Sequence, residues 1–311
     1  MSRFALALLM LPALTMPSLA QPKGSPFAGR WNFNHVSPSG TRASWLGITE
    51  KDGKLDVMYQ PTGGNVIQLK DVKVDGKRLL LTINQATPNR PATTWELEAA
   101  GDKLTGSQRR GESSMPLEGL RAPALKRPEP KNWTKPEPLL NGKNLDGWEP
   151  IGDPTKSRWV VKDGLLVNED HGSNLKSVRK FDDFKLHFEV NCPDHANSGM
   201  YLRGRYEIQL EYDPSSTSPP ERRMGSIYGR IAPNQQLPSM AGKWETFDAT
   251  FVGRTLTLVR NGVTIIDHQE IEGITGGALD ANEAEPGAFY IQGDHPGGLK
   301  FRNITISVPK R

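Results

Sequence analysis

Short runs in which apolar and polar residues alternate recur along the whole chain, and turn-forming residues separate them. Such runs, rich in β-branched and aromatic residues, predict strands, and no segment shows sustained helical periodicity. The Asp-Gly pairs at Asp52-Gly53 and Asp75-Gly76 predict tight hairpins. In the N-terminal part, the expected strands cover residues 44–49, 54–59, 66–74, 78–83, 93–99 and 103–109. The pattern therefore predicts an all-β fold.

A proline-rich stretch divides this pattern in two. Between Arg121 and Pro138 the chain carries five prolines and almost no apolar periodicity, which is typical of a semi-rigid extended linker. We expect an accessory β domain over residues 24–124, either a lipocalin-like barrel or a meander. A linker over 125–137 and a second β domain over 138–309 should follow. The accessory domain shows no cluster of His, Cys or carboxylate residues with catalytic spacing.

The first twenty residues differ from the rest of the chain. A basic start at Arg3 precedes an apolar run over residues 4–14, and Ser18-Leu19-Ala20 supplies a small-x-small cleavage signal. The run is too short to span a bilayer. We expect a signal peptide over residues 1–20, cleaved after Ala20, and a periplasmic or secreted protein without a membrane anchor.

Charge and cysteine content narrow the function classes. The chain has 39 basic and 35 acidic residues, a net charge of +4, and these charges are interspersed rather than gathered in a basic stripe. Nucleic acid is therefore not an expected partner. Cys192 is the only cysteine, so no intramolecular disulfide can form, and we expect a buried or inert thiol.

The segment from residue 199 to residue 212 alternates most clearly. Met200, Leu202, Tyr206, Ile208 and Leu210 share one face, and Tyr201, Arg203, Arg205, Glu207, Gln209 and Glu211 share the other. Such a polar face, spanning roughly 20 Å from Arg203 to Gln209, suits the dense hydroxyls of a sugar. Aromatic rings for the sugar's C–H face could come from Tyr201, Tyr228 and Trp244. A merely solvated sheet face is the alternative.

Ordered motifs across residues 137–309 resemble the family of 3-keto-disaccharide hydrolases. They are LLNGKNLDGW, WVVKDGLL, FDDFKLHFE, NSGMYLR, YEIQ, GSIYG, KWE and IQGDH, in this order along the chain. The resemblance implies a concanavalin A-like jelly-roll β-sandwich and a carbohydrate substrate. It also implies cleavage of 3-keto-glucosides, either by hydrolysis or by removal of the C2 proton with elimination and hydration.

Three residues are the candidates for catalysis in this segment. Glu207 suits a general acid or base, and His295, next to Asp294, titrates near neutral pH. A structural turn in which Asp294 caps backbone amides is the alternative for the last two. The candidate substrate-binding residues are Asn197, Tyr201, Arg203, Gln209, Tyr228, Trp244 and Gln292.

The same residues leave other functions open. The sequence identifies no definite cofactor, although Glu207, Asp294 and His295 could converge on a divalent metal ion; HxH, HExxH and EF-hand spacings do not occur. The chain could also be a non-catalytic carbohydrate-binding protein that uses the same polar face. A third option is a conventional glycosidase in which Glu207 acts with Asp294.

Overall fold

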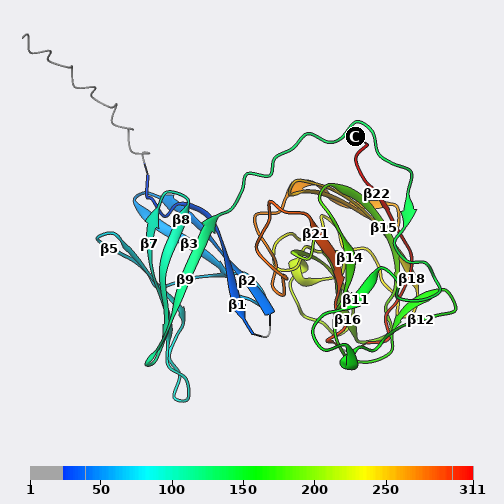
Figure 1. The fold of residues 1–311 in the computed structure, drawn as a ribbon, viewed down its shortest axis with the longest axis horizontal. Coiled ribbons are helices and arrows are strands. Elements are labelled where there is room, and N and C mark those ends of the chain that lie inside the picture. Colours follow the sequence, from blue (N-terminus) through cyan, green and yellow to red (C-terminus); the bar gives the residue numbers. More distant parts are fainter. Residues whose placement is uncertain (1–23, 39, 296, 311) are drawn as a thin grey trace, which may run out of the picture.

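The protein consists of two β domains joined by an extended linker (Figure 1). The computed structural model describes residues 24–38, 40–295 and 297–310, so the predicted signal peptide lies outside the described residues. Within these ranges the only helices are the single turns η1 (Pro154–Lys156) and η2 (Pro220–Arg222). No helix among the described residues has the length and apolar character needed to cross a membrane. The predicted all-β class is confirmed.

The N-terminal domain is one nine-stranded antiparallel sheet with the strand order β4-β3-β2-β1-β9-β8-β7-β6-β5. Its edge strands β4 and β5 are consecutive in the chain, and only residues 69–71 separate them. Because so few residues reach at most about 14 Å, the sheet must curl until its two edges are neighbours. The strands are β1 (Gly29–Ser37), β2 (Gly40–Lys51), β3 (Lys54–Gln60), β4 (Ile67–Gln68), β5 (Val72–Asp75), β6 (Arg78–Asn84), β7 (Thr93–Ala100), β8 (Lys103–Arg110) and β9 (Ser113–Arg121).

Each of the six runs expected in this domain does form a strand, with two differences. The run over residues 66–74 is split into β4 and β5, because the chain passes there from one edge of the curled sheet to the other. Strands β1 and β9 were not among the expected runs. The interior of the curl is apolar and includes Trp31, Phe33 and Trp95, each at most 1% exposed.

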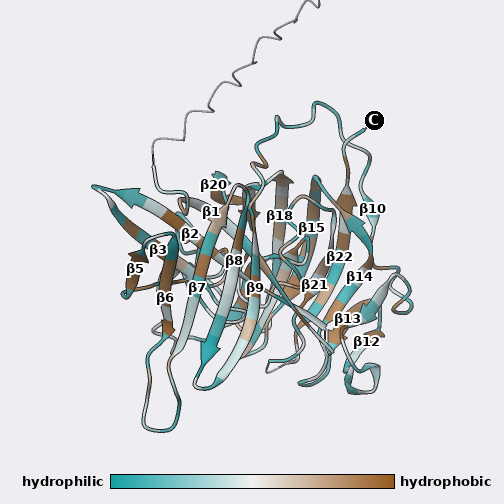
Figure 2. Cartoon of the chain, turned by 60° about the vertical axis from the view of Figure 1, so that its left-hand side comes forward, coloured by the Kyte–Doolittle hydropathy of each residue, from teal (hydrophilic) through white to brown (hydrophobic). Residues whose placement is uncertain are grey.

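The C-terminal domain is a jelly-roll sandwich of two antiparallel sheets. The larger sheet contains β10 (Glu137–Pro138), β12 (Trp159–Lys162), β13 (Leu165–Asn168), β15 (Phe184–Asn191), β18 (Trp244–Val252), β19 (Thr255–Arg260), β20 (Val263–Glu270) and β22 (Lys300–Ser307). The smaller sheet has the order β11 (Trp148–Pro150), β14 (Leu175–Phe181), β21 (Gly287–Ile291), β16 (Ala196–Leu202) and β17 (Tyr206–Tyr212). Hydrophobic positions are interrupted by hydrophilic ones along the strands of both domains (Figure 2). The apolar faces of the two sheets meet in one core.

Strands β16 and β17 realise the alternation predicted from the sequence. Their five apolar residues, Met200, Leu202, Tyr206, Ile208 and Leu210, are fully buried in the core between the sheets. The opposite face of the same hairpin therefore points away from that core, and it carries Tyr201, Glu207 and Gln209. These polar residues are at most 4% exposed, so this face is not a solvated sheet surface.

The linker is attached to the C-terminal domain along its length. The backbone N–H of Arg254 donates to the Leu125 carbonyl at 3.2 Å, and that of Thr134 donates to the Val308 carbonyl at 2.9 Å. Arg127 forms ion pairs with Asp182 at 2.6 Å and Asp183 at 3.0 Å. These contacts fix the extended path of the proline-rich segment, which Figure 1 shows arching from β9 to β10.

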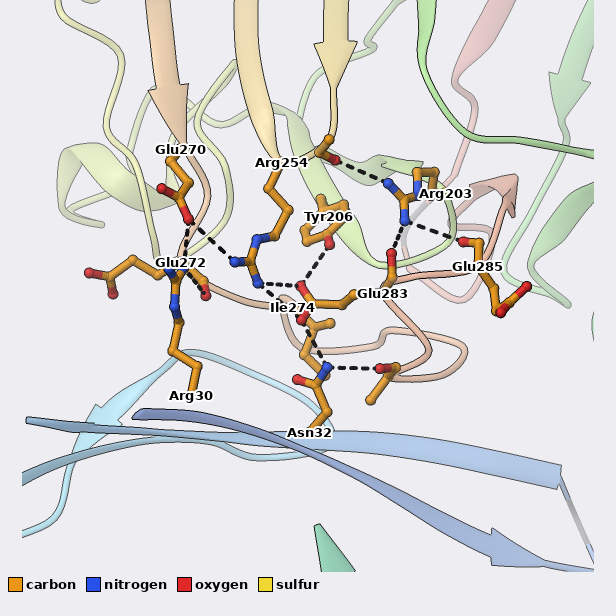
Figure 3. A network of polar contacts seen from close by, with 12 residues as sticks. Arg30, Asn32, Arg203, Tyr206, Arg254, Glu270, Glu272, Ile274, Glu283 and Glu285 are labelled. Carbon is orange, nitrogen blue, oxygen red and sulfur yellow. Dashed lines mark hydrogen bonds and ion pairs between the residues drawn. The ribbon is translucent and has the colours of Figure 1, made fainter. Parts of the chain in front are cut away.

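A buried network of charged and polar groups joins the two domains (Figure 3). The Glu283 carboxylate accepts hydrogen bonds from Asn32 Nδ2 at 2.8 Å and from the Tyr206 hydroxyl at 2.7 Å. It also pairs with Arg254 Nη1 at 3.2 Å, and both charged side chains are at most 1% exposed. Two opposite charges buried together are tolerated because each compensates the other and the remaining oxygen positions are hydrogen-bonded.

Removing one partner of this pair should destabilise the whole molecule. In Glu283→Ala, the buried Arg254 charge keeps only its pair with the partly exposed Glu270 at 3.3 Å, so the free energy of unfolding should fall by about 3 kcal/mol. Urea unfolding followed by tryptophan fluorescence measures this change. Glu285→Ala, which removes an exposed carboxylate two residues away, should stay within about 0.5 kcal/mol of the parent. Equal unfolding midpoints for both variants would contradict the assigned role of Glu283.

Candidate active site

A cavity of about 400 Å³ lies over the polar face of the smaller sheet of the jelly roll. This volume is within the range of small-molecule sites. Eight of the ten residues singled out from the sequence line it together: Asn197, Tyr201, Glu207, Gln209, Tyr228, Gln292, Asp294 and His295. The structure thus brings the three candidate catalytic residues into one cavity with most of the candidate binding residues.

Glu207 occupies the floor of the cavity because of a glycine on the neighbouring strand. In the β16–β17 pairing, Glu207 lies opposite Tyr201 and its side chain leans across Gly199. A Cβ atom at residue 199 would lie 2.3 Å from Glu207 Oε1, closer than any side chain could tolerate. The glycine of the NSGMYLR motif therefore makes room for the carboxyl group.

The Tyr201 hydroxyl is the direct partner of Glu207. It lies 2.8 Å from Glu207 Oε2 and 2.7 Å from the Gly276 carbonyl oxygen, and it accepts a hydrogen bond from Gln292 Nε2 at 3.1 Å. The Tyr201 ring stacks on that of Tyr290 with centroids 4.1 Å apart, and it is fully buried. These contacts hold the hydroxyl, and with it the carboxyl group, in one position.

Glu207 is predominantly protonated at neutral pH. Burial raises its pKa to about 8; the hydrogen bond from Tyr201 opposes this rise and the charge of Asp294 adds to it. The Tyr201 hydroxyl has one proton, which it can donate either to Glu207 Oε2 or to the Gly276 carbonyl oxygen.

Asp294 and His295 form the second titratable group of the cavity. His295 Nδ1 lies 2.9 Å from Asp294 Oδ1. Burial acts to raise the pKa of Asp294, but the hydrogen bond and charge of His295, with the hydrogen bond from Asn174, outweigh it and lower the pKa. The hydrogen bond with Asp294 in turn raises the pKa of His295 above its usual value. The pair thus combines a carboxylate of lowered pKa with an imidazole of raised pKa.

Asn174 holds this pair in place, and sequence reasoning missed it. Its Oδ1 accepts from the backbone N–H groups of Gly293 at 2.7 Å and Asp294 at 3.2 Å. Its Nδ2 donates to the Tyr290 hydroxyl at 3.1 Å and to Asp294 Oδ2 at 3.3 Å. Tyr290 was also missed, although it lies two residues before Gln292 on the same strand face and could have been found by alternation. Asn174 lies in a loop with no local signal.

Two residues singled out from the sequence lie away from the cavity. Arg203 sits in the turn between β16 and β17 with φ 54°, so the strand alternation does not extend to it. Its buried guanidinium donates to the carbonyls of Gly253, at 3.0 Å, and Glu283. Trp244 lies on β18 of the larger sheet, where the Arg302 guanidinium covers its ring at 4.1 Å from the centroid. Both therefore contribute to packing.

Cys192 is a buried thiol. It is 4% exposed, and burial raises the pKa of the thiol to about 12.

Across the described ranges, no group of three or more His, Cys, Asp or Glu side chains is arranged to hold a metal ion. Glu207, Asp294 and His295 share the cavity without forming such a group.

Part of the chain is similar to a known family. Residues 135–307, more than half of the chain, match the family described as 3-keto-alpha-glucoside-1,2-lyase-like domains. No curated protein matches the chain significantly. Among solved structures, two candidate glycosyl hydrolases from Parabacteroides distasonis share 24% and 19% identity with it, with TM-scores of 0.48 and 0.45. The alignments cover 58% and 55% of this chain and 92% of each of theirs. SCLam, a non-specific endo-β-1,3(4)-glucanase, shares 11% identity over 59% of this chain and 86% of its own, with a TM-score of 0.32.

The raised pKa of Glu207 should make stability depend on pH. The folded protein holds the Glu207 proton more tightly than the unfolded chain does. The resulting stabilisation of the folded protein is complete below the pKa of Glu207 in the unfolded chain, and it is lost as pH rises through about 8. Between about pH 5 and pH 9, the free energy of unfolding should therefore fall in the parent relative to Glu207→Gln. The difference should reach a few kcal/mol, since one pKa unit corresponds to about 1.4 kcal/mol.

Urea unfolding of both proteins across this pH range measures the effect. The exposed Glu118 offers a matched control, because Glu118→Gln should leave the pH dependence of the parent unchanged. Parallel curves for the parent and Glu207→Gln would show that Glu207 has an ordinary pKa.

Proposed function

The chain belongs to the family of 3-keto-alpha-glucoside-1,2-lyase-like domains, which are carbohydrate-active, and from that premise we propose that it cleaves 3-keto-glucosides. Cleavage would occur in the cavity of the jelly roll. The observation that carries this proposal is the pair of acid–base groups in that cavity. Glu207 has a pKa raised to about 8, and beside it the pKa of Asp294 is lowered and that of His295 is raised by their mutual hydrogen bond.

The chemistry of a 3-keto-glucoside calls for these two groups. The ketone at C3 acidifies the C2 proton, and a base that removes it leaves an enolate. The enolate electrons form the C1=C2 double bond as the C1–O bond breaks, and an acid protonates the departing oxygen. Water can later add to the unsaturated product, so that elimination and hydration together amount to hydrolysis. In an α-glucoside, the C2 proton and the C1 oxygen lie on opposite faces of the ring, which requires two separate groups.

We assign the acid to Glu207 and the base to His295. Glu207 carries its proton at neutral pH and can give it to the glycosidic oxygen. The Nδ1 atom of His295 is held by Asp294, which leaves Nε2 available to take the C2 proton. The Asp294 carboxylate stabilises the charged imidazole that results, as an orienting carboxylate does for other catalytic histidines.

The remaining polar residues of the cavity are suited to hold the sugar. Gln209 Nε2 donates to Asn197 Oδ1 at 3.1 Å, which fixes both amides, and Gln292 is fixed through Tyr201. Amide groups offer both donors and acceptors for sugar hydroxyls. The Tyr228 ring, which also lines the cavity, supplies an apolar surface for the C–H face.

A conventional glycosidase is the second candidate function, and one observation favours it. Two carboxyl groups with opposite pKa shifts, Glu207 and Asp294, line the same cavity, which is the arrangement that glycosidases use. A sugar-binding protein without turnover would use the same residues for affinity alone.

From the composition of residues 1–20, we infer that the protein acts outside the cytoplasm, where it would meet glycosides before uptake.

Turnover of a 3-keto-glucoside and of its unoxidised parent separates these functions. We expect release of the aglycone from the keto sugar and none from the parent sugar. Glu207→Gln and His295→Ala should each lower kcat at least about 100-fold, the usual effect of losing a general acid or base. Glu118→Gln serves as the control and should keep full activity. Turnover of the parent sugar would favour the glycosidase, and sugar binding without turnover, unchanged in Glu207→Gln, would exclude an enzyme. Adding a chelator to the same assay tests for a metal ion.

The pH dependence of the residual activity in His295→Ala tests the assignment of acid and base. With the imidazole removed, Glu207, whose pKa is raised to about 8, is the remaining member of the assigned acid–base pair. If it acts as the acid, the residual kcat should fall as pH rises through about 8, because Glu207 loses the proton it must donate. A residual kcat that instead increases through the same range would make Glu207 the base.

A further inference from the structure

One wall of the cavity comes from the N-terminal domain, to which sequence reasoning gave no part in the site. Thr41 and Arg42, at the start of β2, line the cavity, as do Thr62, Gly63 and Gly64 from the loop after β3. These residues lie more than 100 positions before Glu207 in the chain. The cavity is therefore formed by both domains.

The outer face of the β1–β2 hairpin holds this wall against the jelly roll. On β1, alternate residues reach across: Arg30 pairs with Glu270 at 2.8 Å, and Asn34 Oδ1 accepts from the backbone N–H of Ala281 at 2.8 Å. On β2, Ala43 and Trp45 belong to the apolar core of the jelly roll. Ala43 and Trp45 are thus buried between the domains, and the more exposed Arg30 and Asn34 add polar contacts across the interface, which fixes the wall in place.

The loop after β3 also touches the loop that orients the catalytic floor. The Gly277 N–H donates to the Thr62 carbonyl at 3.0 Å. A Cβ atom on Gly276 would lie 2.2 Å from the Gly64 carbonyl oxygen, so the two backbones are in direct contact. The Gly276 carbonyl is the acceptor beside the Tyr201 hydroxyl. Gly276 alone therefore lies between the N-terminal loop and Tyr201, the hydrogen-bond partner of Glu207.

Arg42 is the chemically distinctive residue of this wall. Of the described residues that line the cavity, Arg42 and His295 are those whose side chains can carry a positive charge. The Arg42 residue is exposed, and within the described part of the chain its guanidinium forms no ion pair or side-chain hydrogen bond. Its guanidinium therefore keeps its donors free for a ligand in the cavity.

We propose that the N-terminal domain forms the subsite for the leaving group, with Arg42 as a substrate-binding residue. The inference rests on the proposed function. The reacting ring must lie beside Glu207, Asp294 and His295, all of which belong to the jelly roll. The wall that the N-terminal domain supplies then remains to contact the leaving group, which is the aglycone.

The composition of the wall selects the class of aglycone. Its side chains offer two threonine hydroxyls and a guanidinium, with exposed backbone at two glycines, and none of the five residues is aromatic. Such groups match the hydroxyl and ring oxygens of a sugar. The wall therefore suits the second sugar of the 3-keto-disaccharides that the family resemblance implies.

Binding in a Glu207→Gln background, where turnover is suppressed, tests this proposal. The probes are a glucose-containing 3-keto-disaccharide and methyl 3-keto-α-glucoside, which share the reacting ring, and calorimetry measures both affinities. Adding Arg42→Gln should reduce the ratio of disaccharide to methyl glucoside affinity about 10-fold, since the second sugar loses a hydrogen bond to a charged group. Arg42→Lys should recover part of the ratio. Arg110→Gln, an exposed arginine of the same domain outside the cavity wall, should not change it.

The outcomes separate this proposal from the proposed function. A ratio unchanged by Arg42→Gln, or binding of neither probe, overturns the leaving-group subsite. Turnover of the keto sugars by the otherwise unmodified protein is scored in parallel. If turnover occurs while the ratio stays constant, the function stands and the subsite falls. If the ratio falls as expected but no turnover occurs, the subsite stands and the enzymatic function falls.

Discussion

Burial of the outer face of the β1–β2 hairpin against the jelly roll is the constraint on which the rest of the structure depends. These strands already bury their inner residues, such as Trp31 and Leu46, inside the curled sheet. Their outer residues, Asn32 and Trp45 among them, are buried between the domains. A strand buried on both faces cannot move relative to either layer without exposing apolar surface or unpairing polar groups. The two domains consequently present one continuous cavity.

The electrostatics of this cavity follow from the same burial. Glu207 is covered by the loop containing Gly276, and that loop is in turn packed against Gly64 of the N-terminal domain. Exclusion of water is what raises the pKa of the carboxyl group, while the half-buried Asp294 stays ionised beside His295. Two carboxyl groups of similar intrinsic acidity thus acquire opposite protonation states in one site.

Sequence patterns predicted most of the fold and much of the site. Alternation separated the core residues of β16 and β17 from Tyr201, Glu207 and Gln209, because a strand must present successive side chains to opposite faces. It failed at Arg203, where a left-handed backbone ends the strand before the pattern of residue types ends. Trp244 was misplaced for a related reason: an aromatic residue indicates a packed surface but not which of two sheets carries it.

What the sequence determined by itself is local: the strands, the proline-rich linker, and the motif that places Gly199 beside Glu207. Only the tertiary structure decided which distant segments share the cavity. Asn174 meets Asp294 across 120 positions, and Arg42 lies in the other domain. Neither position carries a signal in its own neighbourhood, because the contacts that matter are set by how the curled sheet packs on the sandwich. Short-range patterns record the period of a strand, whereas a site between domains depends on packing.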